Sequence, residues 1–139
     1  MFEIQNTKEI PLLRVNAHVF KHSKFGCTHL HLDCDSTEKA FSVAFRTIPK
    51  DHSGIAHILE HTVLCGSEKF PVRDPFFMMT RRSLSTFMNA MTYPDITAYP
   101  FATLNDKDYR NRLSVYLDAA FFPNIDELDF MQEGHRFEL

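Results

Sequence analysis

The sequence has no basic excess, no long apolar run and few cysteines, and each absence excludes a class of protein. A formal net charge of −3 offers no positive surface to a nucleic-acid backbone, so we expect no nucleic-acid partner. No run approaches the roughly 18 consecutive apolar residues of a membrane-spanning helix, so we expect no membrane partner. Three cysteines, an odd count, fit a reducing compartment better than a disulfide framework.

Glycine and proline are also scarce, and the first residues show no targeting pattern. Only 4 Gly and 7 Pro among 139 residues, with 44% hydrophobic residues, favour a folded core over disorder. The first residues, Met1 to Gln5, have neither the apolar core of a signal peptide nor the Arg-rich pattern of a transit peptide. We therefore expect a cytoplasmic setting, with an organelle as the alternative. The length suits one domain or a piece of a larger one.

The segment richest in chemistry runs from His57 to His61 and reads His-Ile-Leu-Glu-His. In a helix the two histidines are four residues apart and lie on one face. Two neutral imidazoles in that position can share a tetrahedral zinc ion, and Glu60 can take a proton from water that the ion activates. The alternative is a solvated pair of histidines, since so short a match also arises by chance. The apolar flanks argue against it, because burying these polar groups without a partner is costly.

Local patterns predict an α+β fold, with an antiparallel or mixed sheet and helices packed on one face. Alternating apolar residues mark the strands, and spacing of three to four residues marks the helices. Ser53 is the candidate N-cap of the helix that carries the motif. In chain order the predicted elements are strands over 14–21, 28–33 and 40–48, a helix over 54–64, a helix from Asp74, strands over 87–91 and 97–101, a helix over 105–121 with an apolar stripe of Tyr109, Leu113, Tyr116, Leu117 and Ala120, and a strand from His135.

Several segments together carry a family resemblance. They are residues 57–67, 71–77, 82–90, 118–123 and 128–134. The first resembles the active-site helix of the pitrilysin and insulin-degrading zinc peptidases, whose motif is the inverted His-x-x-Glu-His. The others are similar to the presequence-protease branch of that family, and the similarity runs from about Val15 to the last residue. The resemblance implies a zinc-dependent metalloendopeptidase that hydrolyses unstructured peptides such as presequences.

The resemblance also implies roles for individual residues. His57 and His61 match the two histidine ligands of the family's Zn²⁺ ion, and Glu60 matches its general base. Asn89 and the backbone of Ala90 match an edge strand that binds substrate peptides by strand addition. Without the resemblance, Asn89 would be interpreted as an ordinary residue at a strand end.

Members of this family are large proteins of four related domains, and this chain matches most of the first. We therefore expect residues 1–139 to be a single incomplete catalytic domain, whose partners are peptide substrates and the remaining domains of the full-length peptidase. The family's third ligand is a glutamate expected beyond the last residue, with Glu133 and Glu138 as possible substitutes. Such a chain would be inactive alone and prone to self-association. The alternative is a non-catalytic, stand-alone domain that serves protein interaction.

Overall fold

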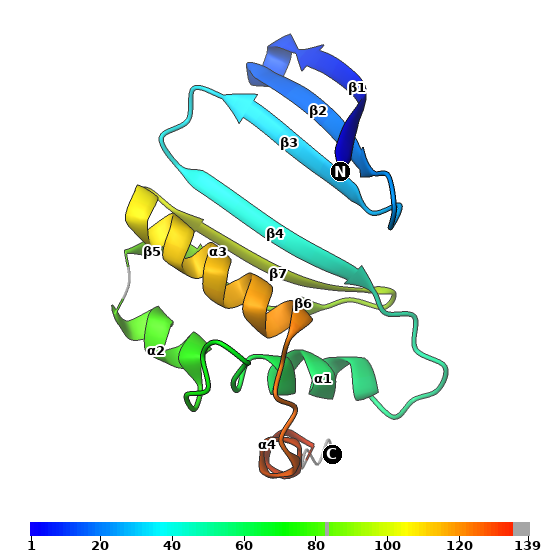
Figure 1. Ribbon diagram of the computed structural model, residues 1–139, viewed down its shortest axis with the longest axis vertical. Helices are drawn as coiled ribbons and strands as arrows, with labels where there is room; N and C mark the ends of the chain where they lie inside the picture. Colours follow the sequence, from blue (N-terminus) through cyan, green and yellow to red (C-terminus); the bar gives the residue numbers. More distant parts are fainter. Residues whose placement is uncertain (83, 135–139) are drawn as a thin grey trace. The chain divides into compact units, whose positions relative to one another are not determined.

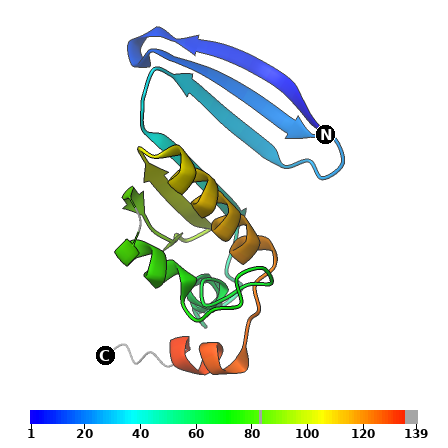
Figure 2. The same cartoon turned by 60° about the vertical axis from the view of Figure 1, so that its left-hand side comes forward.

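The computed structural model describes residues 1–82 and 84–134. The chain divides into two compact units, Met1–Thr37 and Glu38–Leu139, and each has its own sheet (Figures 1 and 2). No helix among the described residues is long and apolar enough to cross a bilayer. The expectation of a single incomplete domain over 1–139 stays a prediction.

The first unit is an antiparallel sheet in the order β1–β2–β3 (Figure 1). Strands β2 (Val15–His22) and β3 (Thr28–Cys34) match the strands predicted over 14–21 and 28–33 and form a hairpin. Gly26 in its turn has a φ of +68°, which glycine adopts without strain. Strand β1 (Phe2–Ile10) pairs with β2 after a single 3₁₀ turn, η1 (Pro11–Leu13). The sequence does not predict β1, because no sustained apolar alternation marks it.

The second unit is built on an antiparallel sheet whose central strand is β7 (Ile96–Thr103). Strand β4 (Lys39–Arg46) pairs along one side of β7. Strands β5 (Ser85–Met88) and β6 (Met91–Thr92) pair along the other side, so they form an edge of this sheet. Of the two arrangements that the sequence allows, the structure therefore has the antiparallel one.

Three helices pack on one face of this sheet: α1 (Ile55–Val63), α2 (Pro75–Arg82) and α3 (Asp106–Phe121) (Figure 2). At the centre of their interface, Phe101 and Tyr116 are each 1% exposed, and their ring centroids are 5.1 Å apart. The predicted α+β fold with helices on one face is thus confirmed. The core consists of Val63, Tyr99, Phe101, Tyr116 and Ala119, surrounded by Phe41, Val43, Phe45, Leu64, Phe76, Met79, Met88, Ala90, Tyr109 and Leu113.

The buried face of α3 agrees with the predicted stripe at Tyr109, Leu113 and Tyr116 and differs from it elsewhere. It includes Arg112 and Ala119, whereas Leu117 and Ala120 are only partly buried. Arg112 is fully buried because its Nε donates to the carboxylate of Asp108 at 2.8 Å, and a paired charge can leave water. A stripe drawn only through apolar side chains misses such a pair.

Helix starts follow the expected signals at α3 but not at α1. The side chain of Asn105 caps α3, because its Oδ1 accepts a hydrogen bond from the amide of Asp108 at 3.0 Å. The N-cap of α1 is Gly54, at a φ of +70°, and no side chain caps this helix. The prediction of Ser53 as the N-cap is therefore wrong. The amide and hydroxyl of Ser53 both donate to the carboxylate of Asp51 instead.

A fourth helix, α4 (Glu127–Glu133), is absent from the predicted elements. Its N-cap is Asp126, which accepts a hydrogen bond from the amide of Leu128 at 2.8 Å. The helix contacts α1, although none of its own residues is buried. A short helix without a buried stripe leaves little periodic signal in the sequence. The strand predicted from His135 lies outside the described residues.

Candidate metal centre

Helix α1 brings the imidazoles of His57 and His61 together on one face. Their Nε2 atoms lie 3.2 Å apart, and the ring centroids are separated by 5.0 Å. Two nitrogens that bind the same tetrahedral zinc ion, at about 2.0–2.1 Å each, are about 3.3 Å apart. The two histidines are therefore already spaced for a shared ion.

Glu60 lies on the same helix and is buried, with 5% of its surface exposed. A carboxylate removed from water needs compensating partners, and one of them is the hydroxyl of Thr92, which donates to Oε2 of Glu60. Burial, and secondarily the charge of this carboxylate, raise the pKa of Tyr99 to about 12. The potential ligand atoms of His57, Glu60 and His61 all lie within 4.8 Å of one another, so the motif converges on one point.

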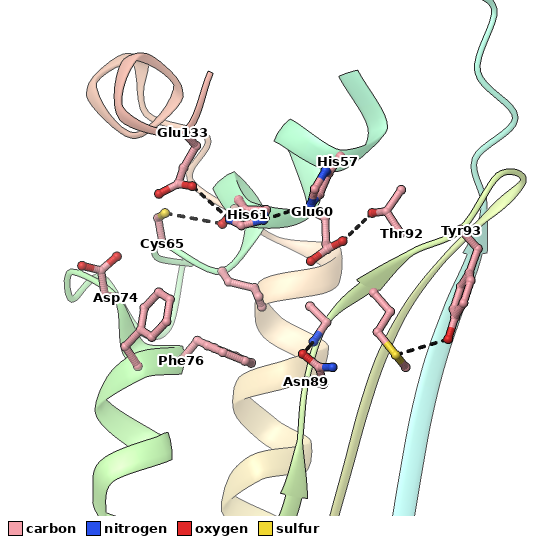
Figure 3. A pocket seen from close by; sticks show the side chains of 14 residues that line it. His57, Glu60, His61, Cys65, Asp74, Phe76, Asn89, Thr92, Tyr93 and Glu133 are labelled. Carbon is pink, nitrogen blue, oxygen red and sulfur yellow. Dashed lines mark hydrogen bonds and ion pairs between the residues drawn. The ribbon is translucent and has the colours of Figure 1, made fainter. Parts of the chain in front are cut away.

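A pocket of about 500 Å³ opens over these three side chains. Pockets of about 300–1,000 Å³ are typical of ligand sites. Figure 3 shows side chains around this pocket from α2, from α4 (Glu127–Glu133) and from the edge of the sheet. The lining consists of His57, Glu60, His61, Leu64, Cys65, Asp74, Phe76, Phe77, Asn89, Ala90, Met91, Thr92, Tyr93 and Glu133.

Asn89 and Ala90 line the same pocket, at the break between β5 and β6. The single strand expected over 87–91 is interrupted here. The amide of Asn89 donates to the carbonyl oxygen of Pro100 on β7 at 3.1 Å, as in a paired strand. The amide of Ala90 instead donates to the side-chain Oδ1 of Asn89 at 3.0 Å. The hydroxyl of Tyr116 donates to the carbonyl oxygen of Asn89 at 3.3 Å and helps to fix this turn of the backbone. The structure thus brings both proposed peptide-binding residues beside the motif.

Helix α4 adds a carboxylate to the site. Oε2 of Glu133 lies 2.9 Å from Nδ1 of His61, whereas the Nε2 atom of that ring faces His57. The sequence left Glu133 open as a third metal ligand, but it contacts the other nitrogen of the ring. Among the described residues, it does not belong to the set of converging ligand atoms. Glu138, the second candidate, lies outside the described residues.

Cys65 also lines the pocket. Burial, together with the carboxylates of Asp129, Asp74 and Glu133, raises the pKa of this thiol to about 12. Its Sγ donates to the carbonyl oxygen of His61 at 3.5 Å. Among the described residues, Cys65 does not belong to the set of ligand atoms that converge within 4.8 Å, so this set consists of two imidazoles and the carboxylate of Glu60.

The sequence matches a known family and close relatives. The model of the family described as "Insulinase (Peptidase family M16)" matches residues 46–136. A mitochondrial presequence protease of Candida albicans is 55% identical over 138 residues, and one of Mus musculus is 56% identical over 137 residues. Each match covers 99% of this chain but only 13% of the relative, so the chain spans about an eighth of the length of these proteins.

Two solved structures share the fold. The crystal structure of pitrilysin matches with a TM-score of 0.77 and 21% identity, over 95% of this chain and 14% of that chain. A protease from Helicobacter pylori matches with a TM-score of 0.70 and 20% identity, over 84% of this chain and 28% of that chain. At such identities the likeness concerns the fold alone, and it agrees with the α+β architecture predicted from the sequence.

Proposed function

The chain belongs to the insulinase family of peptidases, family M16, and from this premise we propose that it forms the metal-binding part of a zinc-dependent metalloendopeptidase. The observation that carries the proposal is the convergence of His57, Glu60 and His61 at the wall of a pocket. The proposed substrates are unstructured peptides such as presequences, in keeping with the names of the relatives.

The donor set fits zinc. His57 and His61 would hold the ion through their Nε2 atoms, which are 3.2 Å apart. When bound, zinc would supply Lewis-acid chemistry, which activates water near neutral pH and polarises a peptide carbonyl. Two imidazoles fill only half of a tetrahedral site, so a third protein ligand is needed from outside the converging set.

Glu60 would act as the general base, because its carboxylate can accept a proton from the attacking water. Its burial keeps bulk water away, and the hydroxyl of Thr92 holds one of its oxygens. A base that is fixed in direction can transfer a proton without first reorienting. A carboxylate oxygen of Glu60 lies within 4.8 Å of the proposed ligand atoms of His57 and His61.

An extended peptide would bind along the edge formed by β5 and β6, as an added strand. Asn89 and Ala90 lie where this edge meets the pocket. To bond a peptide carbonyl, the amide of Ala90 would exchange its present bond to the side chain of Asn89. In this proposal Asn89 keeps the Ala90 amide satisfied until a substrate arrives.

The remaining domains of a longer peptidase are the proposed partners of this chain, since it spans only 13% of its relatives. They would supply the third ligand and the wall that closes over the substrate. The isolated chain is therefore expected to be inactive, and self-association stays a prediction. The names of the relatives describe mitochondrial proteins, so we propose an organellar setting, and the cytoplasmic expectation has no support from them.

Zinc titration of the 139-residue chain tests the metal site. In calorimetry, the wild type should take up one equivalent of zinc, weakly because only two protein ligands hold the ion, and His57→Ala should take up none. The matched control is His52→Ala, which changes a nearby exposed histidine and should bind like the wild type. Equal uptake by the wild type and His57→Ala would refute the assignment and favour a non-catalytic domain.

A further inference from the structure

A carboxylate and an imidazole meet across two helices at the edge of the pocket. Oε2 of Glu133 lies 2.9 Å from Nδ1 of His61, and their side chains are 18% and 30% exposed. Figure 3 shows this contact reaching from α4 to α1. An ionised carboxylate only accepts hydrogen bonds, so Nδ1 of His61 must carry the proton. In a neutral ring, the lone pair is then on Nε2, the nitrogen that faces His57.

Further hydrogen bonds fix the orientation of Glu133 itself. Its second oxygen, Oε1, accepts from Nε2 of Gln132 at 3.1 Å. The side-chain oxygen of Gln132 accepts in turn from Nη2 of Arg73 at 2.8 Å. Both bonds require the same orientation of the Gln132 amide, with its oxygen toward the guanidinium and its nitrogen toward the carboxylate. Glu133 is therefore held by a chain of groups that begins in the loop before α2.

The backbone at the end of α4 also favours this position. The amide of Gly134 donates to the carbonyl oxygen of Phe130 at 2.7 Å and closes the helix directly after Glu133. A Cβ atom at Gly134 would lie 2.9 Å from that same carbonyl oxygen. Any larger residue would have to shift the helix end that carries Glu133.

His57 provides the contrast. Within the part of the chain that the structure describes, its ring has one side-chain hydrogen-bond partner, Nε2 of His61. If that atom accepts, Nε2 of His57 is the donor and must lose its proton before it can bind a metal ion. His61 needs no such change.

We propose that Glu133 is a positioning residue that presets His61 in the Nδ1–H tautomer, with Nε2 directed at the metal. Carboxylates that accept from the outer nitrogen of a metal-binding histidine fix its tautomer and orientation in this way. The relevance to metal binding rests on the proposed function, but the tautomer of His61 does not.

The first test reads the tautomer without any metal. Long-range ¹H–¹⁵N spectra of the imidazoles are recorded on the metal-free chain at about pH 8, where an ordinary imidazole is neutral. His61 is assigned with His61→Gln. The wild type should show the Nδ1–H form, Glu133→Ala should lose that preference, and Glu133→Gln should keep it because an amide oxygen still accepts. The matched control, Glu127→Ala, removes an exposed glutamate from the other end of α4 and should change nothing.

The second test measures zinc affinity by competition with a chromophoric chelator. Loss of such an outer carboxylate typically weakens metal binding by about 10–100-fold, so we expect this from Glu133→Ala, less from Glu133→Gln and none from Glu127→Ala. Circular dichroism checks that each variant is folded. Glu133→Gln has nearly the shape of the wild type, so it remains informative if Glu133→Ala unfolds.

The two tests separate the inference from the proposed function. If the tautomer of His61 in Glu133→Ala equals that of the wild type, the inference is wrong, whether or not zinc binds. It is also wrong if zinc binds wild type and Glu133→Ala equally well. If the tautomer depends on Glu133 but no variant binds zinc at His57 and His61, the inference about His61 stands and the proposed function fails.

Discussion

Both units of the chain contain a close pair of histidines, but the two pairs lie in very different surroundings. In the first unit, His18 of β2 and His31 of β3 are direct cross-strand partners, and their rings stack with centroids 6.0 Å apart. No described residue of that unit is buried. In the second unit, His57 and His61 lie beside the buried carboxylate of Glu60 at the wall of a pocket.

This comparison indicates that convergence and burial, not the number of histidines, make a candidate metal site. Among the described residues, one set of three potential ligands converges within 4.8 Å, and it is His57, Glu60 and His61. In the first unit, His18 is half-buried and shares a hydrogen bond with the hydroxyl of Thr7, His31 is exposed, and no buried carboxylate lies among the described residues of that unit. A buried carboxylate beside two imidazole nitrogens has lost its hydration, and a bound cation would compensate for that loss.

The largest expected effect is on peptide hydrolysis, which should depend on the site in the second unit and not on the histidine pair in the first. In a form of the protein as long as its relatives, Glu60→Gln should keep zinc but slow peptide hydrolysis by about 10²–10⁴-fold, because an amide cannot accept the proton. His31→Gln, which changes the pair in the first unit, should hydrolyse like the wild type. A quenched fluorescent peptide measures both rates. Near-normal turnover by Glu60→Gln would mean that another group is the base.

The next effect compares the two sheets by stability. Phe101 is 1% exposed on β7, so Phe101→Ala should lower the free energy of unfolding by about 3–5 kcal/mol. Leu32 is 53% exposed on β3, and Leu32→Ala should change it by at most about 0.5 kcal/mol. Urea unfolding followed by circular dichroism measures both. A loss for Leu32→Ala as large as that for Phe101→Ala would contradict the view that the buried core belongs to the second unit.

Elements with a strong local signal could be predicted from the sequence. Alternation gave the hairpin of β2 and β3 and strands β4 and β7, and helical spacing gave α1 and α3. Strand β1 and helix α4 could not be found in this way, because neither has a sustained apolar repeat in its sequence. Strand β1 pairs with β2, the next strand in the chain, whereas α4 contacts α1, which is distant in sequence.

The candidate site divides in the same manner. The geometry of His57, Glu60 and His61 follows from helical spacing alone, so the motif was enough. Asn89 came only from the family resemblance, because nothing local distinguishes it from any strand-end residue. Contacts across long sequence separations were not predicted in their observed form, since Glu133 was considered only as a metal ligand. Thr92 reaches Glu60 from the edge of the sheet, and Glu133 reaches His61 from α4.

The smallest effect concerns the acid stability of the second unit. Asp118 on α3 is 4% exposed, and one of its oxygens accepts from the amide of Lys69 at 2.8 Å. Burial acts to raise the pKa of Asp118, but hydrogen bonds from the amide of Lys69 and the side chain of Ser67, together with the charge of Lys69, outweigh it and hold that pKa below its ordinary value. A lowered pKa in the folded state contributes stability above the unfolded-state pKa of about 3.9, and this contribution is lost as pH falls through the folded-state value. Asp118→Asn should therefore be less stable than the wild type at about pH 6, and the difference should shrink toward about pH 2 in urea titrations. Asp33→Asn, an exposed aspartate on β3, should match the wild type at both pH values. A difference for Asp118→Asn that persists unchanged in acid would show that a contact other than the ionised carboxylate is responsible.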